Sequence, residues 1–231
     1  MTLLVISATS FETQPLRDAL TQVTELEFPF GNLCKGKLFD RCLHLAHLGI
    51  GKVNTAAGLS LAIEKFEPDA VIQLGIGGAF IGSFLSNGMV AVAEREIHLD
   101  SGIQYTHGWQ GMKALGFPLS KLDKDYFNEY PTDQDLVRKF KDLGAYPFTF
   151  GTSEAVTGDF ELAAELSKRF DLGVESMEGA AAAQVCLARN VPFAELRGIS
   201  NLVGERNKTA WNIPLAIGNV NKLALAAFRD W

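Results

Sequence analysis

The run Glu175-Ser-Met-Glu-Gly-Ala-Ala-Ala-Ala-Gln-Val-Cys186 is followed closely by Pro192-Phe-Ala-Glu-Leu-Arg-Gly-Ile-Ser-Asn-Leu-Val-Gly-Glu-Arg206. The first run has the small residues of a closely packed helix, which begins beside the carboxylate of Glu178. The second run is an apolar strand that ends in Ser200 and Asn201. Small-molecule sites of parallel α/β proteins form where strand ends and helix starts face each other. The two runs therefore predict an α/β fold with a polar ligand site at this strand end.

Strand and helix patterns alternate along the rest of the chain. Strands are expected at residues 3–7, 42–48, 70–74, 89–93, 146–150 and 193–199, and helices at 12–20, 54–66, 133–143, 162–170, 177–190 and 214–228. Nearly continuous apolar strands between helices are typical of a largely parallel sheet covered on both faces. Residues from about 98 to 130 lack both patterns and are expected to form a loop region. Because no repeat or shift in composition divides the chain, we expect one domain over residues 1–231.

Composition excludes several classes of protein. The net charge is −6 and the basic residues form no run, whereas nucleic acid binding needs clustered Lys and Arg. The sequence contains no apolar segment of about eighteen residues that could span a bilayer, and its start lacks the features of a signal peptide. Three scattered cysteines and four histidines show no metal-ligand spacing. We therefore expect a cytoplasmic protein with no metal, no cofactor, and neither nucleic acid nor membrane as a partner.

Four loops that follow strands are candidates for chemistry, and three of them lie before residue 80. Glu12 follows the first strand and either has a catalytic role or simply stabilises a helix start. The glycines of residues 49–54 and 75–79 either let a ligand approach the backbone or form tight turns. The dinucleotide-binding pattern G-x-G-x-x-G fails at Phe80, its sixth position, which argues against a Rossmann site.

Two polar residues of the opening runs have a more specific interpretation. Close packing of helix on sheet explains the alanines after Glu178, but it does not explain the carboxylate. A single carboxylate there can accept hydrogen bonds from both hydroxyls of a vicinal diol. Asn201 is either a turn residue or a ligand contact, and its place directly after Arg197-Gly-Ile-Ser200 favours the contact.

Five motifs, matching in order and spacing over essentially the whole chain, resemble the nucleoside phosphorylase and nucleosidase superfamily. They are Leu48-Gly-Ile-Gly-Lys-Val-Asn-Thr-Ala-Ala-Gly58, Pro68-Asp-Ala-Val-Ile-Gln-Leu-Gly-Ile-Gly-Gly78, Thr157-Gly-Asp-Phe160, Glu175-Ser-Met-Glu178 and Arg197-Gly-Ile-Ser200. The resemblance implies a single three-layer α/β/α domain with a mixed, mainly parallel and partly closed sheet. It also implies a nucleoside substrate and assembly into a dimer or larger homo-oligomer.

The resemblance assigns roles to individual residues around a nucleoside. Glu178 would hold the 2′- and 3′-hydroxyls of the ribose, with Met177 packed against the sugar. Phe160 would stack on or border the purine. The backbone of Gly77 and Gly78 would line the side of the sugar from which the nucleophile attacks.

The same resemblance distinguishes water from phosphate as the nucleophile. Glu12 matches the acidic position that orients the attacking water in nucleosidases, and Ile50 would line the wall near the 5′ group. Ile76 stands where the family often has Ser or Thr. A phosphate dianion beside Glu12 would meet a like charge, which at about 4 Å costs roughly 1 kcal/mol in water and several in a dehydrated site. Hydrolysis is therefore expected rather than phosphorolysis.

Asn201 bears on the purine that is released. Adenosine-type nucleosidases of the family have Asp at this position, whereas its 6-oxopurine phosphorylases can use Asn, whose amide donates to N7 without delivering a proton. The pattern Ile-Ser-Asn-x-Val-Gly-x-Arg at residues 199–206 resembles the futalosine hydrolase subgroup, which releases hypoxanthine from futalosine in the alternative menaquinone pathway. Its substrate carries a carboxyphenyl ketone at the 5′ end. Tyr105, Trp109 and Arg206 are candidates for the pocket that this group needs.

Three other functions stay open. A 5′-methylthioadenosine/S-adenosylhomocysteine nucleosidase would release adenine, and a purine nucleoside phosphorylase would depend strictly on phosphate. A nucleoside-binding or storage protein with the same fold would bind its ligand without turnover.

Overall fold

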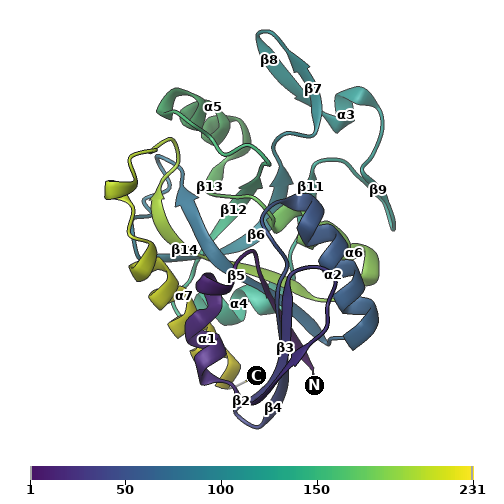
Figure 1. Ribbon diagram of the computed structural model, residues 1–231. Coiled ribbons are helices and arrows are strands. Elements are labelled where there is room, and N and C mark those ends of the chain that lie inside the picture. The colour runs from purple at the N-terminus through teal and green to yellow at the C-terminus, as the bar shows by residue number, and fades with distance from the viewer. Residues whose placement is uncertain (1, 230) are drawn as a thin grey trace.

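The computed structural model describes residues 2–229 and 231 (Figure 1); Met1 and Asp230, which the predicted domain includes, lie outside the described residues. Across the described residues, a ten-stranded mixed sheet has the order β11-β6-β12-β13-β5-β1-β4-β3-β2, with β14 beside β5 and β6. Its strands are β1 (Leu3–Ser7), β2 (Thr21–Leu26), β3 (Asn32–Leu38), β4 (Arg41–His47), β5 (Ala70–Ala79), β6 (Val90–His98), β11 (Glu129–Pro131), β12 (Tyr146–Thr152), β13 (Leu172–Ser176) and β14 (Phe193–Leu202).

The helices and the smaller strands complete the chain. The α-helices are α1 (Gln14–Ala19), α2 (Lys52–Phe66), α3 (Met112–Leu115), α4 (Gln134–Asp142), α5 (Phe160–Phe170), α6 (Gly179–Arg189) and α7 (Ile213–Arg229), and the 3-10 turns are η1 (Ser10–Thr13) and η2 (Lys208–Ala210). Two small hairpins pair β7 (Gly102–Tyr105) with β8 (Gly108–Gly111) and β9 (Ser120–Lys121) with β10 (Asp125–Tyr126).

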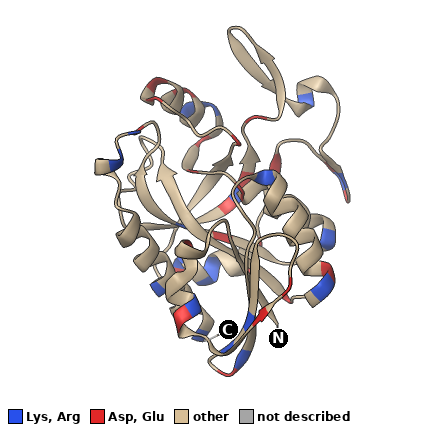
Figure 2. Cartoon of the chain, viewed as in Figure 1, with Lys and Arg blue, Asp and Glu red and all other residues tan. Residues whose placement is uncertain are grey.

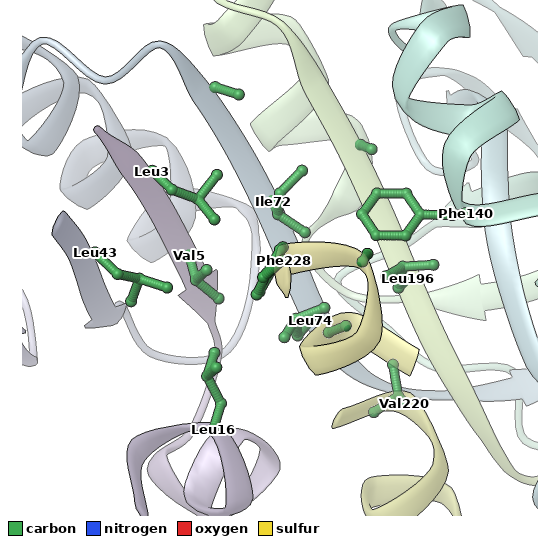
Figure 3. Packing of buried hydrophobic residues seen from close by; sticks show 14 of the residues in the cluster. Leu3, Val5, Leu16, Leu43, Ile72, Leu74, Phe140, Leu196, Val220 and Phe228 are labelled. Atoms are coloured by element: carbon green, nitrogen blue, oxygen red, sulfur yellow. The ribbon is translucent and has the colours of Figure 1, made fainter. Parts of the chain in front are cut away.

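Strand β1 shows why both faces of the sheet carry helices. Leu3 and Val5 pack into one cluster with residues of α1, α4 and α7 (Figure 3), whereas Leu4 and Ile6 pack into another with residues of α2 and α6. Successive side chains of a strand point to opposite faces, so a strand whose residues are all buried must be covered on both faces. Figure 1 shows α1 and α7 on one side of the sheet and α2 and α6 on the other. The predicted mixed α/β architecture is confirmed.

Strand β14 closes part of the sheet on itself. It pairs with β5 in parallel and with β6 antiparallel, and β6, β12, β13 and β5 complete the ring. Small residues such as Ala91 and Ala93 pack there with Phe150, Val174 and Ile199. Because β14 has neighbours on both edges and is buried almost throughout, any charged side chain on it must find a partner inside the protein.

The glycine run after residue 74 is not a turn, so the interpretation of these glycines as a tight turn is wrong. Strand β5 continues from Ala70 to Ala79, and none of Gly75, Gly77 and Gly78 has a positive φ. A Cβ on Gly75 would lie 2.5 Å from the Arg197 guanidinium and 2.8 Å from Glu12 Oε1. Glycine is therefore required here because two charged side chains lie directly against the strand.

Residues 21–38 and 98–130 contain more regular structure than the sequence predicts. The first segment forms β2 and β3, and the second includes both small hairpins and α3. Strand β2 is largely exposed and β3 carries Lys35 and Lys37, so neither has the apolar pattern of a buried strand. Figure 1 shows the β7–β8 hairpin projecting from the body of the protein.

Charged residues of both signs are interspersed over the ribbon in Figure 2. Within the part of the chain that the structure describes, no helix is long and apolar enough to cross a membrane.

His98, at the end of β6, should make folding sensitive to acid. It is 4% exposed, its Nε2 lies 3.1 Å from Gln184 Oε1, and its ring meets Tyr130 edge-on. Burial, reinforced by the positive charge of Lys52, lowers the pKa of His98 from 6.5 to about 4. Because the folded protein binds this proton less readily than the unfolded chain, the contribution of His98 to stability is fully present above its unfolded pKa of 6.5. This stabilisation is lost as the pH falls from 6.5 towards 4.

We expect His98→Phe to remove up to about 3 kcal/mol of this pH dependence, because one pKa unit corresponds to about 1.4 kcal/mol. Phenylalanine keeps an aromatic ring beside Tyr130. The measurement is the free energy of unfolding in urea of both proteins at several pH values. A difference between the two proteins that stays constant from pH 7 to pH 4 would contradict the assignment.

Candidate active site

A cavity of about 280 Å³ lies where β1, β5, β13 and β14 end. It is lined by Ala8, Thr9, Phe11, Glu12, Ile50, Ile76, Gly77, Gly78, Val156, Glu175, Ser176, Met177, Glu178, Arg197, Ser200, Asn201, Arg206 and Trp211. These residues come from segments far apart in the sequence, and the strand ends bring them together, as predicted from residues 175–186 and 192–206.

Arg197 of β14 is the central cation of this site and is only 2% exposed. Its Nη2 donates to Glu178 Oε2 at 2.9 Å, and its Nη1 donates to the Ile76 carbonyl at 3.0 Å and lies 3.9 Å from Glu12 Oε1. Its Nε donates to Glu195 Oε1 at 2.5 Å. Burial alone would lower the pKa of Arg197, but the carboxylates of Glu195, Glu178 and Glu12 together raise it, so the guanidinium stays charged.

Glu12 is held from three sides in η1, the turn that follows β1. Its Oε2 accepts from the backbone N–H and the hydroxyl of Thr9 at 2.9 and 2.7 Å, and its Oε1 accepts from the Ile76 N–H at 3.1 Å. Asn221 of α7 donates to the Glu12 carbonyl at 2.8 Å. The carboxylate therefore stabilises the start of a helical turn, which was one of the two roles predicted for Glu12. It also lines the cavity with a fixed orientation.

Glu178 is the residue directly before α6 and bridges two other segments. Its Oε1 accepts from the Gly51 N–H at 3.0 Å, while Oε2 accepts from Arg197. Gly51 reaches this position with φ of 93°, a left-handed conformation that favours glycine. The loop of residues 49–54 thus positions a backbone amide on the carboxylate, and the lone pairs of Glu178 that remain are available to a ligand in the cavity.

Asn201 has its amide oriented by its neighbours. The Ser200 hydroxyl donates to Asn201 Oδ1 at 2.7 Å, and Asn201 Nδ2 donates to the Leu202 carbonyl at 2.8 Å. The pairing of β14 with β5 shifts register between Ile199 and Asn201, a bulge that re-aims side chains at a strand end. An amide nitrogen has two hydrogens, so Asn201 can still donate one hydrogen bond into the cavity.

The outer wall of the cavity is more apolar and more open. Phe11 and Ile50 are 50% and 55% exposed, and Trp211 lies beside Arg206, whose guanidinium carbon is 5.2 Å from the indole centroid.

Glu175 is a further carboxylate that faces the cavity, and it is held by the N–H and hydroxyl of Thr157. Burial raises the pKa of Glu175, while Thr157 and the charge of Arg206 act in the opposite direction.

Most of the residues singled out from the sequence line this one cavity: Glu12, Ile50, Gly77, Gly78, Met177, Glu178, Asn201 and Arg206. Phe160 does not line it. It is 45% exposed at the start of α5, next to Gly204. Tyr105 and Trp109 lie on the β7–β8 hairpin, where Trp109 packs edge-on against Phe170. The roles given to these residues remain predictions.

Sequence reasoning missed Arg197 and Glu175 as members of the site, and Glu195 as the buried partner of Arg197. Glu195 and Arg197 are two residues apart on an apolar strand, and they therefore point to the same face. Charged residues in a strand that is otherwise fully apolar are costly to bury unless they are paired, and this was the signal available in the sequence. Within the described residues, no group of three or more His, Cys, Asp or Glu side chains could hold a metal ion.

The sequence was compared with models of known protein families. The sequence model of the phosphorylase superfamily matches residues 2–229. The chain belongs to this superfamily. The superfamily resemblance drawn from the five motifs is thereby confirmed.

Relatives of this chain include a futalosine hydrolase and several 5′-methylthioadenosine/S-adenosylhomocysteine nucleosidases. A futalosine hydrolase from Thermus thermophilus is 35% identical over 171 residues, which make up 73% of this chain and 73% of that protein. A 5′-methylthioadenosine/S-adenosylhomocysteine nucleosidase from Haemophilus ducreyi is 26% identical over 235 residues, or 98% of this chain and 97% of that protein. The solved structure of such a nucleosidase from Campylobacter jejuni is 26% identical, covers 100% of both chains and has a TM-score of 0.83.

Proposed function

We propose that the protein hydrolyses the N-glycosidic bond of futalosine and releases hypoxanthine, as a step of the alternative menaquinone pathway. The observation that carries this proposal is the oriented amide of Asn201. Ser200 donates to its oxygen, and its nitrogen keeps one hydrogen that it can donate into the cavity. Such a donor stabilises the charge that develops on N7 of a departing purine, but it cannot deliver a full proton. It therefore suits hypoxanthine, which is a better leaving group than adenine.

Glu12 and Glu178 support hydrolysis at the ribose. Glu12 is fixed by Thr9 and Ile76 and can orient a water molecule and accept its proton as the water attacks C1′. Glu178 can hold the 2′- and 3′-hydroxyls while Arg197 and Gly51 keep its carboxylate in place. The same negative charge of Glu12 opposes a phosphate dianion.

Arg206 supports a substrate with an anionic 5′ group. Of the two arginines that line the cavity, Arg197 is paired with buried carboxylates, whereas Arg206 stacks on Trp211 and is exposed to solvent. A guanidinium can pair with a carboxylate through two parallel hydrogen bonds, which is what the carboxyphenyl group of futalosine would require. One relative of the chain is a futalosine hydrolase.

A second candidate is a 5′-methylthioadenosine/S-adenosylhomocysteine nucleosidase. Relatives with this activity align over nearly the whole chain, and a solved structure of one has the same fold.

Under either function, we propose that residues 1–231 act as one three-layer domain in a cytoplasmic homo-oligomer. Exposed apolar side chains such as Phe84 and Phe117, 68% and 67% exposed, are available for contact between subunits.

Asn201→Asp tests the base preference. An aspartic acid can supply the proton that adenine needs to leave, so we expect the ratio of kcat/KM for futalosine to that for methylthioadenosine to fall at least about tenfold. The measurement is the rate of release of hypoxanthine and adenine from the two substrates. Ser200→Ala is the matched control, because it loosens the amide without adding an acid and should slow both reactions alike. An unchanged ratio in Asn201→Asp would remove the support that Asn201 gives to this proposal.

The nucleophile is tested in phosphate-free buffer made with ¹⁸O-labelled water. Hydrolysis places one labelled oxygen at C1′ of the sugar product, and adding phosphate leaves the rate unchanged. A rate that depends on phosphate, with a sugar 1-phosphate as the product, would establish a phosphorylase instead.

A further inference from the structure

Two buried carboxyl groups meet behind the wall of the cavity, where neither contacts the substrate space. Glu96 of β6 and Glu195 of β14 are both 0% exposed. A Cβ placed on Gly179, the first residue of α6, would lie 1.9 Å from Glu195 Oε2 and 2.6 Å from Glu96 Oε2. The two carboxyl groups therefore face each other across the space left by the missing side chain of Gly179.

The hydrogen bonds around this pair are incomplete if both groups are ionised. Glu195 Oε1 accepts from Arg197 Nε, and Glu96 Oε2 accepts from the Thr152 hydroxyl at 3.2 Å. Glu195 Oε2 and Glu96 Oε1 are buried and have no hydrogen-bond partner among the described residues. Buried polar atoms in native proteins are nearly always paired, so these two acceptors indicate a donor between them.

The balance of charge leads to the same conclusion. Glu12, Glu178 and Glu195 surround the single guanidinium of Arg197, and Glu96 would add a fourth buried negative charge. An isolated buried carboxylate costs far more than a neutral carboxyl group, which instead acts as a hydrogen-bond donor.

We propose that Glu96 and Glu195 share one proton, and that this pair fixes the orientation of Arg197 and, through it, of Glu12 and Glu178. The proton resides mainly on Glu96 and is donated to Glu195 Oε2. Glu195 then keeps one negative charge for Arg197 Nε, which leaves Nη2 for Glu178 and Nη1 beside Glu12. Glu96 and Glu195 are positioning residues, because they act on the reaction only through Arg197.

The surroundings of Glu96 favour its neutral form. Burial, and then the negative charge of Glu195, raise the pKa of Glu96 well above its ordinary range, while Arg197 and Thr152 act in the opposite direction. The pair also explains the glycine after Glu178, since any side chain at Gly179 would collide with both carboxyl groups.

The pair is tested first without substrate, by infrared difference spectroscopy of the full-length protein at neutral pH. Wild-type protein should show the carbonyl stretch of a protonated carboxyl group, and Glu96→Gln should lose this band. Glu94→Gln is the matched control, because Glu94 lies on the same strand but is exposed, and it should leave the band unchanged. A wild-type spectrum without the band, or a band that survives in Glu96→Gln, would overturn the proposal.

The positioning role is tested by kinetics with whichever nucleoside the protein hydrolyses, and it rests on the proposed nucleosidase function. Glutamine at position 96 can still donate to Glu195, whereas leucine cannot. We expect Glu96→Leu to lower kcat by about 10- to 100-fold and Glu96→Gln to stay within about threefold of wild type. Equal losses in both variants would contradict the role of the donated hydrogen bond.

The infrared test uses no substrate, so its result does not depend on the proposed function. If the band behaves as expected while no nucleoside is cleaved, the shared proton stands and the proposed function fails.

Discussion

Replacing Glu12 with Gln is expected to lower kcat for nucleoside hydrolysis by about 10²- to 10⁴-fold, the usual contribution of a general base. Glutamine retains the shape of the side chain and an oxygen that can accept from Thr9 or from the Ile76 N–H. It cannot accept a proton from the attacking water. The loss should therefore appear in kcat, with a small effect on KM, in steady-state assays of purine release.

The matched control for Glu12→Gln is Asp18→Asn on α1. Asp18 pairs with Gln14 at the surface and does not line the cavity, so this variant should keep wild-type kcat. If Glu12→Gln retains full activity, water is not activated by this carboxylate. If the protein binds nucleosides without turnover before and after the change, it is a binding protein.

Replacing Arg197 with Met should have the largest effect on stability. Met has a comparable length but leaves Glu12, Glu178 and Glu195 buried without their shared cation. Removing one partner of a buried ion pair typically costs about 3–5 kcal/mol, a large part of the roughly 5–15 kcal/mol that stabilises a whole domain. The measurement is the free energy of unfolding in urea at neutral pH.

Arg138→Met is the matched control for Arg197→Met. The Arg138 side chain is 69% exposed and pairs with Asp135 on the surface of α4, where a salt bridge contributes about 0–1 kcal/mol. Arg138→Met should therefore leave stability nearly unchanged. A loss of similar size in both variants would show that the buried network of Arg197 has no special part in stability.

The parts of the fold that could be predicted from the sequence are those whose strands are buried on both faces. Residues 3–7 and 193–199 are mostly apolar, because helices cover both sides of β1 and β14. Strands β2 and β3 could not be found in this way, since solvent covers much of their surface and their pairing partners, not their side chains, define them. Strand β5 was predicted to end too early, because Gly75 and Gly77 lack side chains that would indicate a strand.

The residues of the candidate site also differ in whether the sequence predicts them. Glu12, Glu178 and Asn201 stand at strand ends or helix starts, positions that a sequence pattern can locate. The role of Arg197 depends on contacts with residues 19 to 185 positions away in the chain, and local sequence does not encode such contacts. The pairing of Glu96 with Glu195 depends in the same way on the closure of the sheet by β14.

One assay determines which base the protein releases. Purified protein is incubated in phosphate-free buffer with futalosine, inosine or 5′-methylthioadenosine, and the free purines are separated and quantified. We predict hypoxanthine from futalosine at a kcat/KM well above that for the other two nucleosides. Release of adenine from 5′-methylthioadenosine, with no hypoxanthine from futalosine, would show that the protein is not a futalosine hydrolase.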